Sequence, residues 1–134
     1  MKKIIIIIFL LLEENTTLIA QTIDFDTIIH LNPEQKAEFQ GSMGAFSRFL
    51  QKNLKYPEAA LKTNATGKIY VEFIVEKDGS ITHIDVLKSA GFGWNEEMIR
   101  VLKLSPKWIP AKDKGKIVRS KYYLTIPCIM LIED

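Results

Sequence analysis

The sequence predicts an α+β fold in which a small antiparallel sheet carries helices on one face. Three observations lead to this class. Two segments with strand-like alternation, Lys68 to Val75 and Ser80 to Lys88, flank a tight turn. A helical pattern follows them, and a long apolar segment closes the domain. Helical patterns also precede the first strand, so the sheet is expected to have a helical lead-in segment.

The first two predicted strands form a hairpin. Ile69, Val71, Phe73 and Val75 alternate with more polar residues, as in a sheet with one buried face. The turn Asp78-Gly79 favours a hairpin because glycine accepts the positive φ that such turns require. In the return strand Ile84 and Val86 point inward. Ile81 is out of phase with them, which predicts a bulge or a change of face.

Three helices are predicted from apolar spacing and caps. Ser42 is expected to cap a helix whose buried face carries Phe46, Phe49, Leu50 and Leu54. Tyr56-Pro57 ends that helix and starts a short one over residues 57–62. Asn95 is expected to cap a third helix, Glu96 to Leu104. The buried stripe of this third helix consists of Trp94, Met98, Val101 and Leu102.

The final predicted strand runs from Ile117 to Ile132 and contains Pro127. Proline cannot donate to a strand ladder, so Pro127 indicates an edge strand or a bulge. An edge strand offers unpaired backbone groups, which a partner strand can use. Trp108, between the third helix and this strand, is expected to be a core or rim anchor.

The N-terminus has the pattern of an export signal. Lys2 and Lys3 precede the apolar run Ile4 to Leu12, which is shorter than a membrane span of about 20 residues. Cleavage after Ala20 gives three parts: a signal peptide over residues 1–20, a lead-in segment over 21–41 and the domain over 42–134. A periplasmic location follows. The alternative is an inner-membrane anchor facing the periplasm, over Ile4 to Ala20, although the acidic pair Glu13-Glu14 inside it would be costly.

The sequence gives no indication of an enzyme or a cofactor. A short strand that pairs or wraps on the domain is expected from the apolar residues Ile23, Phe25, Ile28, Ile29 and Leu31, with Asp24 and Asp26 on its exposed side. These two acids have no neighbouring nucleophile, and His83 is expected to be an exposed strand residue. The lone cysteine, Cys128, is expected to be buried, and no cysteine and histidine spacing suits a metal. A net charge of +2 is too small to indicate nucleic acid. Eight basic residues and one acid between Arg100 and Lys121 form a patch that suits an acidic partner or a solvated face.

From Tyr56 to Leu131 a series of motifs resembles the C-terminal domain of TonB, the energy transducer of Gram-negative envelopes. The series begins with Tyr56-Pro57 and Ala60, and continues with Gly67 and the strand that ends before Asp78-Gly79. Its later members are Val86, Ser89, Gly91, Glu97, Ser105-Pro106-Lys107-Trp108-Ile109-Pro110, Gly115, Val118 and Ile126-Pro127. The resemblance implies a three-stranded antiparallel sheet with two helices on one face, in agreement with the elements above.

The resemblance also implies a function. The family binds a short peptide of outer-membrane transporters along its last strand, which places the pairing edge at Lys121 to Leu124. The partner-binding residues implied are Arg119, Lys121, Tyr122, Tyr123, Leu124 and Pro127. With a single proline, Pro33, between Leu12 and Ser42, the chain has no proline-rich spacer there, so we expect a free-standing module that binds an envelope protein or a TonB-dependent transporter. A membrane-anchored energy transducer and a homodimeric structural module are the alternatives.

Overall fold

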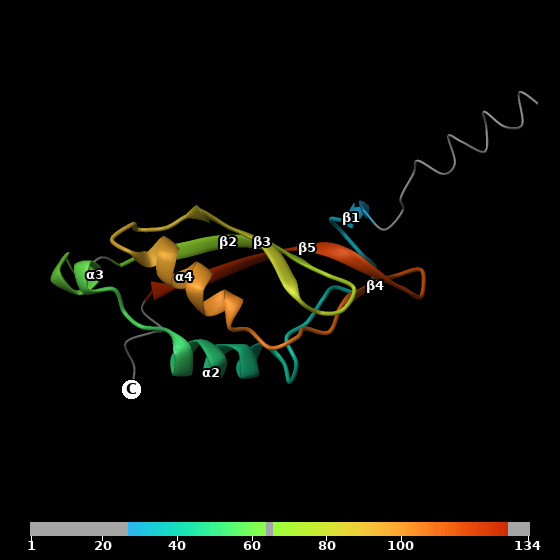
Figure 1. Cartoon of the computed structure of the whole chain (residues 1–134), viewed down its shortest axis with the longest axis horizontal. Coiled ribbons are helices and arrows are strands. Elements are labelled where there is room, and N and C mark those ends of the chain that lie inside the picture. Colours follow the sequence, from blue (N-terminus) through green and yellow to red (C-terminus); the bar gives the residue numbers. More distant parts are fainter. Residues whose placement is uncertain (1–26, 64–65, 129–134) are drawn as a thin grey trace, which may run out of the picture.

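The computed structural model describes residues 27–63 and 66–128 (Figure 1). Its helices are α2 (Met43–Asn53), α3 (Glu58–Thr63) and α4 (Trp94–Lys103). Its strands are β1 (Ile29–His30), β2 (Lys68–Val75), β3 (Ile81–Lys88), β4 (Ala111–Asp113) and β5 (Lys116–Pro127). The predicted signal peptide and the residues after Cys128 lie outside the described part of the chain.

The α+β prediction is confirmed, with a sheet larger than the predicted three strands. The strand order is β1-β5-β2-β3, and β4 pairs with the beginning of β5. β2 is antiparallel to both of its neighbours, and its register with β5 runs without a shift from Lys68 opposite Pro127 to Val75 opposite Ser120. The two additional strands are short: β1 contributes two residues and β4 three.

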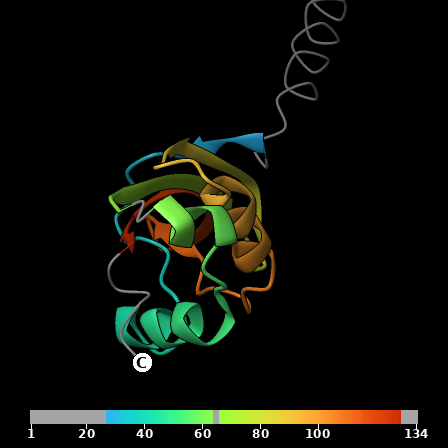
Figure 2. The same ribbon diagram turned by 90° about the vertical axis from the view of Figure 1, so that its left-hand side faces the viewer.

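The helices lie on one side of the sheet, where they cover its apolar face (Figure 2). α4 buries Trp94, Met98, Val101 and Leu102, the stripe that the sequence predicts. α2 buries Phe46 and Leu50, and Trp108, in the segment after α4, is 1% exposed. Edge-on aromatic contacts join Trp108 to Phe39, Phe46, Phe73 and Tyr122. Trp108 is therefore the anchor of the core rather than of its rim.

The hairpin between β2 and β3 is confirmed, together with the predicted irregularity in β3. The register shifts between Glu72 and Ile74, where His83 has a φ of 51°. This bulge brings Ile81, Ile84 and Val86 all against the core. In the turn, Gly79 has a φ of 86° and accepts a hydrogen bond of 2.8 Å from the Trp108 N–H. A Cβ at this position would lie 2.1 Å from the Trp108 carbonyl oxygen, so only glycine fits.

Ser42 is the N-cap residue of α2 as predicted, but neither predicted cap makes a side-chain capping bond, and the predicted cap Asn95 is at the wrong position. Ser42 precedes α2 but makes no side-chain capping bond, because its backbone has a φ of 93° and a ψ of 174°, far from the usual capping conformation. α4 begins at Trp94, one residue before the expected cap, and its N-cap is Gly93. Asn95 lies inside the first turn, where its side chain contacts the hydroxyl of Ser89. Among the described residues, no helix is long and apolar enough to span a membrane.

Candidate partner-binding edge

β5 is paired with β2 along most of its length on one side, and only part of its other side has a strand neighbour. β2 pairs with residues 120–127, β4 with 116–118, and β1 runs parallel to β5 at Arg119 and Ser120. Within the described part of the chain, the stretch from Lys121 to Pro127 has a strand neighbour on the β2 side alone. We call the other side of this stretch the free edge; it includes the predicted pairing edge, Lys121 to Leu124.

The register decides which backbone groups the free edge offers. The Cys128 N–H donates to the Gly67 carbonyl at 2.8 Å, on the β2 side. Backbone groups alternate sides along a strand, so those of Pro127 face the other way. Because the register with β2 has no shift, the N–H and C=O groups of Lys121, Tyr123 and Thr125 also face the free edge. Pro127 has no N–H, which limits any added ladder at that end.

The predicted side chains of β5 divide between the two faces of the sheet. Tyr122 and Leu124 point into the core, where Leu124 is 6% exposed and the Tyr122 ring stacks on Phe73 at 5.5 Å. This burial raises the pKa of Tyr122 above its ordinary value, and the Glu38 carboxylate acts in the same direction. Lys121 and Tyr123 point to the outer face, where Tyr123 is 59% exposed. An added strand would therefore contact Tyr122 and Leu124 from the helix side and Tyr123 from the outer side.

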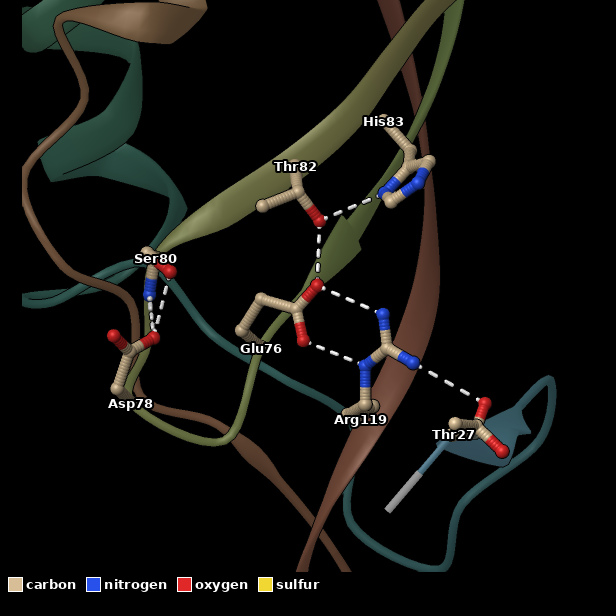
Figure 3. Close-up of polar contacts among 7 residues, drawn as sticks. All are labelled: Thr27, Glu76, Asp78, Ser80, Thr82, His83 and Arg119. Atoms are coloured by element: carbon tan, nitrogen blue, oxygen red, sulfur yellow. Dashed lines mark hydrogen bonds and ion pairs between the residues drawn. The ribbon is translucent and has the colours of Figure 1, made fainter. Parts of the chain in front are cut away.

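Arg119 has a structural role at the beginning of the free edge (Figure 3). Its guanidinium makes two bonds to Glu76, of 2.6 and 3.0 Å, and donates a third, of 3.2 Å, to the Thr27 carbonyl. The bond from Arg119 lowers the pKa of Glu76, and a bond from the Thr82 hydroxyl adds to this effect against the opposing effect of burial. Arg119 thus ties the N-terminal segment to the hairpin, a use that the sequence did not indicate.

Residues 27–38, which we call the strap, end the free edge on the Ser120 side. The strap pairs with β5 through β1, and with the segment before β5 through backbone bonds of Gln35 with Lys112 and of Glu38 with Ile109. His30 contacts Asp113 at 3.0 Å, and Pro33 and Ala37 are buried. A strand added from the Pro127 end therefore meets the strap at Ser120.

Two grooves open beside the free edge. One lies between α2 and the end of β5; its lining residues are Met43, Phe46, Ser47, Leu50, Gln51, Leu124, Thr125, Ile126 and Pro127. The other lies between the strap and residues 120–123, and it is lined in part by Lys36 and Lys121. Neither groove was predicted from the sequence. The apolar face of α2 was visible there, but nothing indicated that this helix lies along β5.

The remaining candidates have no catalytic arrangement among the described residues. His83 is exposed on β3, and its ring contacts the Thr82 hydroxyl at 3.0 Å. Cys128 is buried as predicted, and burial raises the pKa of its thiol, which disfavours the reactive thiolate. The described residues contain no group of acidic, histidine and cysteine side chains that suits a metal ion. Asp24 and Asp26 lie outside them.

Comparison with known proteins identifies the family. A family model described as "Gram-negative bacterial TonB protein C-terminal" matches residues 52–127, more than half of the chain. Among solved structures, the TonB C-terminal domain of Helicobacter pylori (residues 194–285) is similar, with 23% identity and a TM-score of 0.41. The match covers 69% of this chain and 96% of that domain. No curated protein sequence matches. The chain belongs to the TonB C-terminal family, whose members are protein-interaction modules of TonB-dependent transport.

Proposed function

We propose that this protein is a periplasmic interaction module that binds an extended segment of an outer-membrane transporter, or of another envelope protein, as an added strand along β5. The observation that carries the proposal is the free edge. It presents the backbone groups of Lys121, Tyr123 and Thr125 without a strand neighbour on that side in the described residues. Strand addition uses such groups for affinity and the adjacent side-chain pockets for specificity.

The free edge has features that favour one added strand over open-ended pairing. The strap ends it at Ser120, and Pro127 removes a donor at the other end. The stretch between them is seven residues long, from Lys121 to Pro127. This length suits a short peptide segment and limits unspecific edge-to-edge association.

An NMR titration tests the proposal. The labelled protein is titrated with synthetic peptides that cover the periplasm-facing N-terminal segments of TonB-dependent transporters from the same cells. We expect the amide signals of Lys121, Tyr123 and Thr125 to shift and to gain protection from hydrogen exchange, since a partner carbonyl then accepts from each. Binding that leaves these three amides unchanged would rule out strand addition at this edge.

The same backbone groups also suit a second copy of the chain, which is the homodimer alternative. A two-fold dimer would pair β5 with β5 of the partner copy. Sedimentation of the peptide-free protein over a range of concentrations separates the two functions. Self-pairing makes the average mass rise with protein concentration, whereas a monomer keeps the same mass. A dimer at low concentration would favour the structural module.

The periplasmic location rests on the N-terminal export pattern. Mass determination of the mature protein tests it, and we expect a chain that begins near Gln21. A membrane-bound chain that retains Met1 would instead support the anchored energy transducer.

A further inference from the structure

The groove between α2 and β5 lies directly against the free edge. Its β5 lining consists of four consecutive residues, 124–127, of which Leu124 and Ile126 point to the core and Thr125 and Pro127 to the outer face. Because the groove is lined by residues that point to the core and by residues that point to the outer face, it extends along the backbone of β5 at these positions. All of its other lining residues come from α2, so it opens on the side away from β2.

The lining is apolar where a partner side chain would enter. Met43, Phe46 and Leu50 lie on one face of α2, at spacings of three and four residues, and face Leu124 and Ile126 across the groove. The two polar members from the helix are Ser47 and Gln51. The cavity has a volume of about 160 Å³, and Met43 is 49% exposed at its mouth.

We infer that this groove is a specificity pocket for apolar side chains of the strand that adds to β5, an inference that rests on the proposed strand addition. A strand beside β5 lies about 4.8 Å away, and alternate side chains point to the helix side of the sheet. Those opposite Leu124 and Ile126 enter the groove. The partner segment therefore carries two apolar residues separated by one residue, within an extended stretch of the length of the free edge.

The pocket depends on a part of the chain outside the family match. Met43, Phe46, Ser47 and Leu50 precede residue 52, where the match begins. The free edge lies within the family match, so membership of the family already favours strand pairing there. Under this inference, α2, which precedes most of the match, selects the apolar side chains of the partner strand. Replacement of α2 residues should accordingly change which segments bind without removing the backbone ladder.

Selection from a random peptide library tests the pocket even while the natural partner is unidentified. The full chain is used as bait for displayed random ten-residue peptides, and the enriched peptides are sequenced. We expect apolar residues at positions i and i+2 in the enriched set, and shifts of the Tyr123 and Thr125 amides with a synthetic copy of the best binder. Replacement of both apolar residues by serine should weaken the binding of this copy at least tenfold, since burial of one branched side chain contributes about that factor.

Variants of α2 provide the matched comparison. Ser47→Trp fills the groove and should weaken the same peptide about tenfold or more. Arg48→Trp, at an exposed neighbouring position that does not line the groove, should bind as the unchanged protein does. Met43→Ser removes apolar lining at the exposed mouth and should weaken binding severalfold, which covers the case that Ser47→Trp does not fold.

The outcomes separate the pocket from the edge. If no peptide binds, or binding leaves the β5 amides unchanged, strand addition and the pocket both fail. If peptides shift the β5 amides but show no apolar pair and tolerate Ser47→Trp, strand addition stands and the pocket is wrong. A chain that dimerises, and that Ser47→Trp returns to monomer, would assign the groove to a second copy and overturn the inference.

Discussion

Arg119 shows how one side chain can hold two distant parts of the chain in place. Its side chain is 19% exposed and bonds to Glu76 and to the Thr27 carbonyl, so both partners depend on it (Figure 3). Exposed ion pairs contribute little to stability, whereas removal of one partner from a buried pair leaves an uncompensated charge. The contribution of the Arg119–Glu76 pair to stability lies between these limits, because the Glu76 side chain is 21% exposed.

We predict that Arg119→Met lowers the free energy of unfolding by about 2 kcal/mol near neutral pH. The loss should depend on pH. Arg119 holds the pKa of Glu76 below the ordinary value of 4.5, so the pair's contribution is complete above that pH and disappears as the pH falls through the lowered pKa. Urea unfolding at neutral and at acidic pH measures this, and the difference between the two proteins should narrow in acid.

Lys107→Met is the matched control for Arg119→Met. Lys107 lies 3.6 Å from Asp78, and both side chains are more than 60% exposed, at 66% and 61%. Its replacement should leave stability nearly unchanged at every pH. Equal losses in the two variants would show that Arg119 has no special role in joining the strap to the hairpin.

The start of α2 illustrates how an element can be predicted correctly with the wrong local reason. The sequence places a helix after Ser42, and a helix forms there because Phe46 and Leu50 are buried against the core. Ser42 contributes no capping bond. It holds a φ of 93° and a ψ of 174°, a conformation that is open almost only to glycine and costs other residues about 1–3 kcal/mol.

We therefore predict that Ser42→Gly stabilises the protein by about 1 kcal/mol, because glycine removes this strain and part of the gain is offset by its flexibility in the unfolded chain. Thermal and urea unfolding measure the change. Ser47→Gly, in the middle of α2, should instead destabilise by about 0.5 kcal/mol. A loss of stability in Ser42→Gly would mean that the Ser42 side chain supports the helix after all.

The elements that the sequence predicted well are those specified by local signals. Alternation and the Asp78-Gly79 turn define β2 and β3, and apolar spacing defines α2 and α4. The sequence predicts a short strand within residues 23–31 that pairs or wraps on the domain, and β1 pairs with β5. Its position on the sheet was not predicted, because the contacts of the strap are long-range: Thr27 and Arg119 are 92 residues apart, and His30 and Asp113 are 83 apart. The free edge was predicted from a local signal, the proline in the last strand. Its end at Ser120 and the groove beside α2 were not predicted, because both depend on segments far apart in the sequence.

The whole molecule is a sheet with one face covered by helices, and in the described residues two strand edges lack a strand neighbour: the outer edge of β3 and the part of β5 beyond Ser120. The helices cover the inner face, β3 is the last strand on one side of the sheet, and the strap covers the other side as far as Ser120 (Figures 1 and 2). Beyond Ser120, the proposed function has another chain pair with the backbone groups of β5. The affinity for a partner strand should therefore depend on backbone N–H groups of β5 that make no ladder bond to β2, and a substitution can remove such a group without unfolding the protein.

We predict that Thr125→Pro abolishes binding of a partner strand while the protein remains folded. The Thr125 N–H faces the free edge and makes no ladder bond to β2, so proline removes a donor that the folded chain does not use. The fixed φ of proline costs some stability, about 1 kcal/mol. Peptide titration measures the first effect and urea unfolding the second.

Ile126→Pro gives the contrast that makes this prediction specific. The backbone N–H of Ile126 faces β2 opposite Ile69, so proline there removes a ladder bond. The Ile126 side chain is 4% exposed, so its replacement also leaves a space in the core. That variant should lose several kcal/mol and unfold far more readily. If Thr125→Pro binds the partner as tightly as the unchanged protein, the β5 backbone is not the binding surface.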